Sequence, residues 1–518
     1  MTASPKSGDF DTIVIGSGMG GMAAAAALTR VGHKVLLLEQ HRTLGGLTHS
    51  FSRGGFTWDV GIHYLSEMAP GDRIRELIDW LSDTPIDFVP LGAVYDYVHI
   101  GSAEPLALSR PFEAQERDLK DRFPEEAEAI EAWTRALHEG QEAMLRIFPA
   151  RAMPKIAGDM LDWWNRRAIS KWCARTTKEV IDEITHNPEL AAVLAAQWGD
   201  HGGRPSKASF AVHALIAGAY LPSGSWYPVG GSAAFAEHII PTITKNGGEA
   251  RAGTRVEGLL FDGGTVVGVR TEEGTEIRAK TVISDIGARE TIDAFLPEEI
   301  GHEDWMAEIR ALPSSIAHFD LFLGFEGDIE AAGATKANHW FYPTGDVDVV
   351  WTDAPDGAPP HMTVSFGSLK NPAHDPGPRQ KHMGQILVWA DWRTVDRWAG
   401  QPAGARGDDY ADFKRRVEET LMAEFERYFP DLAKLVVYRE LATPLSTVTF
   451  TGHRKGAFYG LDGTPERVMC DGLRARTPIP GLFLAGQDVA SQGIPGALWG
   501  GLLAAASADP KVLPKFRG

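Results

Sequence analysis

Residues 11–46 read DTIVIGSGMGGMAAAAALTRVGHKVLLLEQHRTLGG, and this stretch decides the fold. The short, β-branched run at 13–15 predicts a buried parallel strand. Three glycines in G-x-G-x-x-G spacing follow, an Ala-rich segment predicts a helix to about residue 30, and a second apolar run at 34–38 predicts another strand. Strand, glycine turn, helix and strand in this order predict a dinucleotide-binding unit.

Each residue of this motif has a distinct role. Gly16 permits the tight turn, Gly18 lets a pyrophosphate approach the backbone, and Gly21 lets the helix pack closely on the strand. The helix N-terminus, at about Met19, offers free N–H groups and a positive dipole end to the phosphates. Glu39 follows the second strand, about 20 residues past the glycines, and is placed to accept hydrogen bonds from a ribose diol.

Further motifs indicate which dinucleotide is bound. Gly45 and Gly46 follow Glu39 in an E-x5-G-G pattern, which resembles the flavoprotein superfamily of amine oxidases, phytoene desaturases and their relatives. Four segments are similar to its retinol saturase and carotenoid isomerase branch: GLTHSF at 46–51, WDVGIHY at 58–64, GLFLAGQD at 481–488 and GIPGAL at 493–498. The resemblance implies an α/β fold, with a Rossmann-type FAD-binding domain interleaved with an α+β substrate domain, and FAD as cofactor.

The same resemblance implies how the chain divides. The FAD-binding domain would consist of residues 1–86, 226–300 and 461–518, with the substrate domain formed by 87–225 and 301–460. The strand signals between 255 and 284, separated by Gly-containing turns, look like an antiparallel meander.

Motif and resemblance together assign cofactor contacts. Asp488 would meet the ribityl chain or pyrophosphate, Val256 would hold the adenine through its backbone, and a helix from about Gly496 would direct its N-terminus at the N1/C2 edge of the flavin. The full set expected to contact FAD is Gly16, Gly18, Met19, Gly21, Glu39, Gln40, Gly45, Gly46, Leu47, Thr48, His49, Gly61, Ile62, His63, Val256, Gly486, Asp488, Ile494, Pro495, Gly496, Ala497 and Leu498.

Four residues are candidates for chemistry. His63 and Tyr64 follow Gly61 in a segment that resembles the flavin-facing loop of the family, where a histidine either relays a proton or supports the ring. His213 is placed with Ala217 and Tyr220 on one helix face beside small residues that leave room for a long ligand, although packing inside the core is the favoured interpretation. Tyr459 lies in a Gly-framed turn, and its role is left open.

Composition excludes several classes of protein. A net charge of −18 argues against nucleic acid as a partner. Two cysteines cannot form a disulfide framework, metal-binding spacings are absent, and no run of about 18 apolar residues occurs. The first ten residues hold no apolar core of a signal sequence. These features predict a cytoplasmic protein, either free or resting on a membrane surface.

One basic, Trp-rich segment departs from the acidic average. Residues 146–178 contain eight basic residues against two acidic ones, with Trp163, Trp164 and Trp172 interleaved. This combination suits a helix at a bilayer interface. It suits equally a cap helix whose tryptophans pack on the substrate domain, and the resemblance to enzymes of membrane-borne substrates favours the bilayer.

These observations predict an FAD-dependent oxidoreductase that acts on carbon–carbon double bonds of a long hydrophobic lipid: a retinoid, a carotenoid or other isoprenoid, or an unsaturated fatty acyl chain. Saturation is favoured, and desaturation and cis–trans isomerisation are the alternatives. A non-catalytic lipid escort and an amine oxidase are the rival classes. No second G-x-G-x-x-G motif is present, so the electron donor or acceptor is left open.

Overall fold

The predicted dinucleotide unit forms at the N-terminus of the chain. The structure is a computed structural model that describes residues 10–352, 354 and 357–517; the expectation about the first ten residues falls almost wholly outside them. Strand β1 (Thr12–Ile15) leads through a turn at Gly16, where φ is +94°, into α1 (Met19–Arg30) and β2 (Val35–Leu38). A positive φ is tolerated by glycine because it has no Cβ. The turn therefore requires the glycine that the motif supplies.

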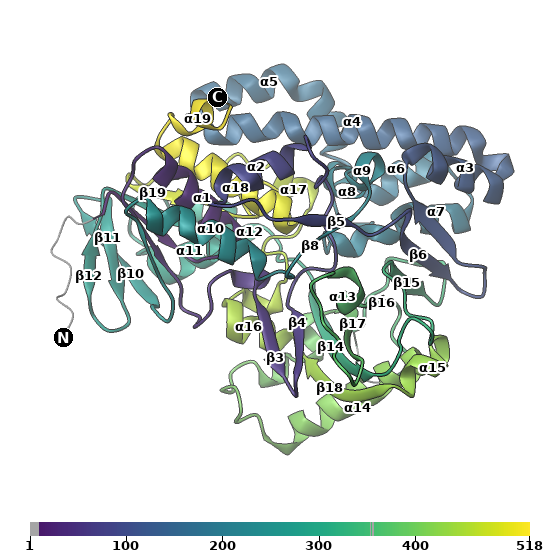
Figure 1. The fold of residues 1–518 in the computed structure, drawn as a ribbon. Helices are drawn as coiled ribbons and strands as arrows, with labels where there is room; N and C mark the ends of the chain where they lie inside the picture. The colour runs from purple at the N-terminus through teal and green to yellow at the C-terminus, as the bar shows by residue number, and fades with distance from the viewer. Residues whose placement is uncertain (1–9, 353, 355–356, 518) are drawn as a thin grey trace.

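A five-stranded parallel sheet organises this part of the molecule (Figure 1). Its order is β19-β13-β1-β2-β9, and every neighbouring pair is parallel. The additional strands are β9 (Glu249–Arg251), β13 (Thr281–Ser284) and β19 (Leu482–Leu484). The strands come from three stretches that lie far apart in the sequence. Helix α1 packs between α10 (Ala234–Lys245) and α18 (Gly493–Ala508), so the sheet face that it covers is sealed from solvent.

The predicted meander is partly wrong. Strands β10 (Val256–Asp262), β11 (Thr265–Thr271) and β12 (Glu276–Arg278) do form an antiparallel three-stranded sheet. Residues 281–284, expected in the same meander, instead join the parallel sheet as β13. The pairing partners of β13, β1 and β19, are distant in sequence. The residues at 281–284 are mostly apolar because both faces of a parallel strand are buried.

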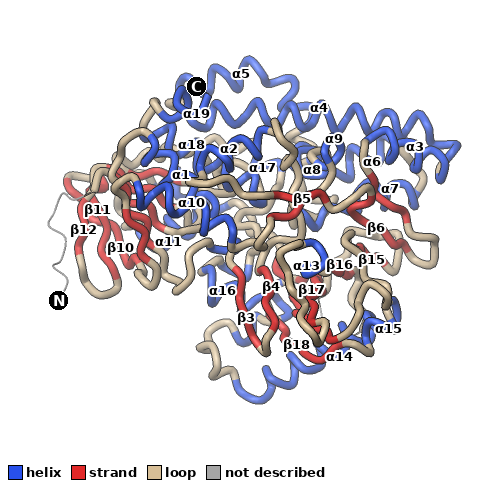
Figure 2. Tube along the Cα trace, viewed as in Figure 1, coloured by secondary structure: helices blue, strands red, loops and turns tan. Residues whose placement is uncertain are grey.

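A seven-stranded mixed sheet forms the second half of the molecule (Figure 2). Its order is β18-β14-β17-β16-β15-β6-β7, and α14 (Gly407–Tyr428) packs its apolar stripe on one face, against Phe319 and Phe325. Its strands are β6 (Val94–Ile100), β7 (Leu106–Ser109), β14 (Ala317–Glu326), β15 (Asn338–Tyr342), β16 (Met362–Ser365), β17 (Lys381–Ala390) and β18 (Val436–Ala442). Two antiparallel pairs complete the strands: β3 (Ser50–Arg53) and β4 (Phe56–Asp59) form a hairpin, and β5 (Phe88–Pro90) pairs with β8 (Trp226–Pro228), which is distant in sequence.

Helices cover both sheets. Two differ from expectation: the run at 209–220 breaks into α8 (Phe210–Ala217) and α9 (Tyr220–Ser223), and α18 begins at Gly493 rather than near Gly496. The others are α2 (Arg73–Leu81), α3 (Phe112–Arg122), α4 (Ala127–Ala152), α5 (Lys155–Trp172), α6 (Thr177–Ile184), α7 (Pro188–Ala195), α11 (Ala288–Phe295), α12 (Glu303–Ala311), α13 (Gly367–Lys370), α15 (Pro430–Ala433), α16 (Pro444–Thr451), α17 (Pro465–Val468) and α19 (Val512–Arg517).

Helix α5 lies along α4 at the outer edge of the molecule (Figure 1). Its outward face carries large apolar side chains: Trp164 and Ile156 are each 80% exposed, Met160 is 70% exposed and Trp163 is 61% exposed. Trp172, which the sequence grouped with these tryptophans, is buried and packs on Phe210. The basic segment thus divides into an exposed part and a packed part. No helix among the described residues is long and apolar enough to cross a bilayer.

Candidate active site

A large cavity joins the two halves of the molecule. Its volume is about 1290 Å³, larger than the ~300–1,000 Å³ of an ordinary small-molecule pocket. One end is formed by the β1–α1 turn and the start of α18, and the interior end by the loop after β4, α9, β14 and the turn at 458–460. The cavity therefore has room for a dinucleotide and a second molecule.

The dinucleotide end is built from closely packed backbone. A Cβ atom on Gly18 would lie 2.8 Å from the Asp285 carboxyl, one on Gly46 would lie 2.8 Å from the Gly18 Cα, and one on Gly21 would overlap the Gly16 carbonyl. Helix α1 has no side-chain cap from Gly18, and of its first N–H groups that of Gly21 donates to Asp285, which leaves the N–H groups at the very start of the helix for a ligand. These features suit a pyrophosphate at the helix N-terminus.

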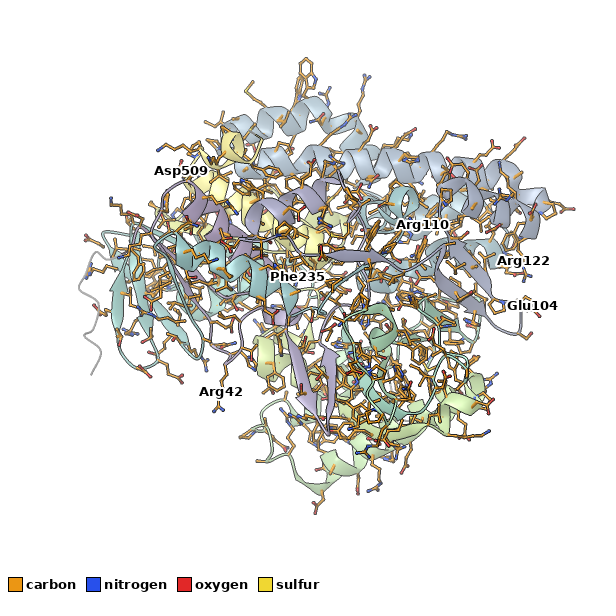
Figure 3. All side chains as sticks on the ribbon, in the orientation of Figure 1. Arg42, Glu104, Arg110, Arg122, Phe235 and Asp509 are labelled. Carbon is orange, nitrogen blue, oxygen red and sulfur yellow. The ribbon has the colours of Figure 1, made fainter. Side chains whose placement is uncertain are left out.

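Glu39 holds this loop together. Its Oε2 accepts hydrogen bonds from the Ser17 backbone N–H at 2.9 Å and from the Ser17 hydroxyl at 2.7 Å, and its Oε1 accepts from the His41 N–H at 2.8 Å. Oε2 thus already accepts two hydrogen bonds, whereas Oε1 accepts one and can still accept a second from a ribose hydroxyl. Glu39 lines the cavity, so it can contact a ligand as well as hold the loop in place. Arg42, in the same loop, points away from the molecule (Figure 3).

Sequence reasoning missed Asp285 at this end. Its Oδ2 accepts the Gly21 N–H at 2.7 Å, and the Gly18 and Gly486 backbones approach the same carboxyl. Burial raises its pKa to about 8, and the nearby carboxylates of Glu39 and Asp488 act in the same direction, against the Gly21 hydrogen bond. The Asp285 side chain is therefore largely neutral at pH 7. An aspartate directly after a buried strand was the signal available in the sequence.

Most of the expected cofactor residues line the cavity, and four do not. Gly21, Gly45, Ile62 and Leu498 lie behind its wall. Asp488 lines it while accepting the N–H groups of Ala288 at 2.8 Å and Leu461 at 2.9 Å. The expected residues that line the cavity are Gly16, Gly18, Met19, Glu39, Gln40, Gly46, Leu47, Thr48, His49, Gly61, His63, Val256, Gly486, Asp488, Ile494, Pro495, Gly496 and Ala497.

His63 lines the interior end as a neutral imidazole. Burial, together with smaller electrostatic effects of Lys370 and His318, lowers its pKa to about 3. The Lys370 ammonium, on α13, donates to the His63 carbonyl at 2.8 Å and fixes this stretch of backbone. Proton exchange near neutrality, which an unperturbed histidine would offer, is not available to His63. Its Nδ1 is buried without a hydrogen-bond partner among the described residues, so it is free to contact a ligand.

Tyr64 lies beside two buried carboxyl groups. Its hydroxyl is 2.8 Å from Asp96 Oδ2, on β6, and 3.0 Å from Asp200 Oδ2, at the end of a short 3-10 helix (Ala196–Asp200). The Tyr64 ring contacts the Tyr220 ring edge-on at 5.0 Å. Tyr64, Asp200 and Tyr220 line the cavity, whereas Asp96 lies behind them. The two aspartates were not identified from sequence, because no local motif surrounds either of them.

Of the two remaining candidates for chemistry, Tyr459 lies at the cavity and His213 does not. Tyr459 lines the interior end, as does His318 of β14, which the sequence did not single out. His213 is fully buried outside the cavity, within 3.1 Å of a His201 ring nitrogen and 3.2 Å of the Leu194 carbonyl. Ala217 also lies outside it, so of that predicted face only Tyr220 reaches the cavity. His213 thus fits the packing interpretation.

Comparison with known proteins places the chain in a family. Residues 19–380 match the family described as flavin containing amine oxidoreductase. The chain is 31% identical to the all-trans-retinol 13,14-reductase of Danio rerio over 95% of its own length and 85% of that protein. It is 23% identical to the chloroplastic prolycopene isomerase of Daucus carota, over 96% of this chain and 80% of the other.

Solved structures show the same fold. Cyclohexylamine oxidase from Brevibacterium oxydans superposes with a TM-score of 0.61 at 17% identity, covering 98% of this chain and all of the other. The family match and the relatives confirm the resemblance, the fold class and FAD as cofactor, and the glycine-lined cavity end fits that cofactor. The chain belongs to the flavin containing amine oxidoreductase family and is an FAD-dependent oxidoreductase.

Proposed function

We propose that this enzyme saturates a carbon–carbon double bond in a long apolar polyene of the retinoid type. The observation that carries the proposal is the 31% identity, along nearly the whole chain, to a protein named all-trans-retinol 13,14-reductase. Desaturation and cis–trans isomerisation of a related lipid are the alternatives, and the similarity to prolycopene isomerase supports the second of these.

The interior end of the cavity supports an apolar substrate. Leu145 and Phe148 of α4, Leu215 and Ile216 of α8, and Phe458 line it. A hydrocarbon chain gains roughly 25 cal/mol for each Å² removed from water, so burial against these side chains supplies binding energy. A carbon–carbon double bond carries no charge that the protein could bind, so catalysis depends on how the substrate is positioned.

FAD and the protein have different roles in the proposed reaction. Bound FAD supplies hydride transfer at its isoalloxazine ring. Lys370 fixes the backbone at His63, while the neutral His63 and His318 rings add polar contacts that carry no charge into the apolar site. Side chains of α4, α8 and β14 line this part of the cavity. The protein thus provides the surface against which a polyene is positioned.

A single experiment distinguishes the alternatives. Lipids from cells with and without the protein, and polyenes incubated with the holoenzyme in its reduced and in its oxidised form, are compared by mass spectrometry. Saturation predicts a product two hydrogens heavier, desaturation one two hydrogens lighter, and isomerisation an unchanged mass with altered retention. Peroxide release on amines with no change in any polyene would contradict the proposal and favour an amine oxidase.

We further propose that the outward face of α5 rests on an anionic bilayer. Ile156, Met160 and Trp164 recur at helical spacing on one exposed stripe, and Arg166 and Arg167 are exposed beside them. An exposed apolar stripe edged by arginines suits the headgroup boundary, where indoles and cationic side chains are both accommodated.

The fixed position of α5 supports the same proposal. Arg474 is nearly buried and bonds to Asp159 of α5 at 2.6 Å, which holds the inward face of the helix on the body of the protein. Helix α4, beneath α5, contributes Leu145 and Phe148 to the cavity. A bilayer at α5 would therefore lie one helix layer from the substrate site.

Vesicle sedimentation tests this contact. The double variant Trp163→Ser/Trp164→Ser and the double variant Arg166→Glu/Arg167→Glu should each lose binding to vesicles that contain phosphatidylserine. The matched control Val437→Ser removes an apolar side chain that is 56% exposed on β18 and should bind like the wild type. High salt should weaken binding, because surface charges are screened within about 8 Å at physiological ionic strength. Sedimentation unchanged in both double variants would contradict bilayer contact.

A further inference from the structure

Two aspartates at the interior end of the cavity share one hydroxyl donor. They cannot both be ionised and both accept a hydrogen bond from it. Tyr64 has one hydroxyl proton, yet its oxygen lies 2.8 Å from Asp96 Oδ2 and 3.0 Å from Asp200 Oδ2. An ionised carboxylate is only an acceptor, and a phenol can donate to one acceptor at a time. One of the two contacts therefore requires a proton on an aspartate.

The two aspartates differ in position. Asp96 is fully buried, and its Oδ2 also accepts from the Gln197 amide at 2.9 Å. Asp200 lines the cavity. A proton on Asp200 thus faces the space that a substrate would fill, while Asp96 stands behind Tyr64 as a second buried acid. The side chains of this arrangement come from three separate segments: the loop at 64, β6 at 96, and the 3-10 helix that carries 197 and 200.

Burial is the main cause that favours protonated acids at the pair, and it acts against the Lys370 charge and the hydrogen bonds that Asp200 accepts from Tyr64 and Tyr220. Burial raises the pKa of Asp200 to about 7 and raises that of Asp96 well above its ordinary range, with the Asp200 charge adding to the effect on Asp96. The other titratable groups facing Asp200 are Tyr95, Tyr220, Tyr342, Tyr459 and Lys370. The four phenols have raised pKa values, so they do not ionise near neutrality. The Lys370 pKa is lowered by burial to about 7, and its charge opposes the rise at both aspartates.

We propose that Asp200 is the acid that protonates one carbon of the substrate double bond, and that Tyr64 and Asp96 resupply its proton. This inference rests on the proposed saturation. The O–H bond of Asp200 breaks and a C–H bond forms with the π electron pair of the double bond. The hydride of reduced FAD, the two-electron donor, provides the second C–H bond. As the resulting Asp200 carboxylate takes the Tyr64 proton, Tyr64 takes one from Asp96 in the same step, so no phenolate forms and Asp96 is left as the carboxylate.

The alternatives in the cavity are less suited to this role. His63 and His318 have pKa values of about 3 and about 4, so neither carries a cationic proton at neutral pH. Asp320 also lines the cavity with a raised pKa, but the hydrogen bond that its carboxyl accepts among the described residues comes from the Gln385 amide, at 3.5 Å, and not from an acid that could resupply a proton. Of these groups, Asp200 combines access to the cavity with a buried resupply path.

Asp200→Asn in the intact holoenzyme tests the assignment, because the amide keeps the shape and removes the acid. We expect FAD content to be unchanged and turnover per bound flavin to fall by about 10²-fold or more, the range for a lost general acid. The wild-type rate should decline as pH rises through about 7, since Asp200 is then deprotonated. The variant should lose that decline. Asp320→Asn, the matched control for removal of a buried carboxyl, should keep it.

Infrared spectroscopy supplies a readout independent of turnover. A protonated-carboxyl band that disappears as pH rises through about 7 should be present in the wild type and in Asp320→Asn, and absent from Asp200→Asn. If the wild type reduces a polyene and Asp200→Asn does so as fast with the same pH profile, the inference alone is overturned. If the wild type reduces no polyene, the proposed function fails and this role of Asp200 fails with it, even where the infrared band is seen.

Discussion

The two ends of the cavity are built in opposite ways. The dinucleotide end is formed chiefly by backbone from one short stretch, residues 16–49, together with the start of α18. The interior end is formed by side chains from distant segments, among them Tyr64, Asp200 and His318, with Lys370 behind them. Backbone geometry is set locally by glycines, whereas the ionisation of buried groups is set by everything packed around them. Substitutions at the first end should therefore change cofactor binding, and those at the second should change turnover.

The largest expected effect is at the first end. Gly18→Val places a branched side chain against the Asp285 carboxyl, 2.8 Å from its Cβ, where the pyrophosphate must approach. We expect the variant to fold and purify without flavin. Gly345→Val is the matched control, because a Cβ there meets no atom within 4 Å and φ is not positive. Full flavin occupancy in Gly18→Val, measured by absorbance, would show that the glycine turn does not bind the cofactor.

Glu39→Ala should have a smaller effect of the same kind. It removes the acceptor for Ser17 and His41 as well as the expected ribose contact. Loss of a hydrogen bond to a charged group amounts to about 1.5–3 kcal/mol, or roughly 10- to 100-fold in Kd for FAD. Titration of the apoprotein with FAD measures this. An unchanged Kd would mean that Glu39 contributes only to loop structure.

Asp285 should make FAD binding depend on pH. Its pKa is raised to about 8, so the carboxyl is neutral below that pH and becomes negative above it. A negative charge beside the helix N-terminus competes with the phosphates, so FAD affinity should fall as pH rises from 7 to 9, by up to about tenfold per pH unit above the pKa. Asp285→Asn should remove this dependence. The same slope in both proteins would exclude Asp285 as its source.

His63→Ala should have the smallest effect, at the second end. Since the His63 pKa is about 3, the ring is neutral across the working range and its loss removes no titration between pH 5 and 8. We expect turnover per bound flavin to fall by less than about tenfold, below the range for a lost general acid. A fall of 10²-fold with a lost ionisation would restore His63 as the proton carrier and displace Asp200.

The same contrast explains what the sequence could predict. The β1–α1–β2 unit, the glycine turn and the place of Glu39 are encoded within 30 residues, and the structure reproduces them almost residue for residue. Strand β13 was assigned to the wrong sheet because its partners, β1 and β19, are distant in sequence.

The interior end depends on tertiary structure that no local pattern reports. Asp96 and Asp200 meet at Tyr64 only after β6 and the 3-10 helix that ends at Asp200 have packed together. His63 was found by its resemblance to a flavin-facing loop, but its ionisation depends on burial and on Lys370, more than 300 residues away. The identity of the cofactor was therefore predictable from sequence, whereas the proposed acid, Asp200, was not.

The most direct test of the account is a single turnover without oxygen. The purified holoenzyme is reduced at its flavin, mixed with all-trans-retinol, and followed by flavin absorbance and product mass. We expect the flavin to be reoxidised at the same rate as a retinoid two hydrogens heavier is formed. We also expect both rates to fall together in Asp200→Asn while FAD stays bound. A flavin that stays reduced in the presence of retinol and of other polyenes, or that is reoxidised with no hydrogenated product, would contradict it.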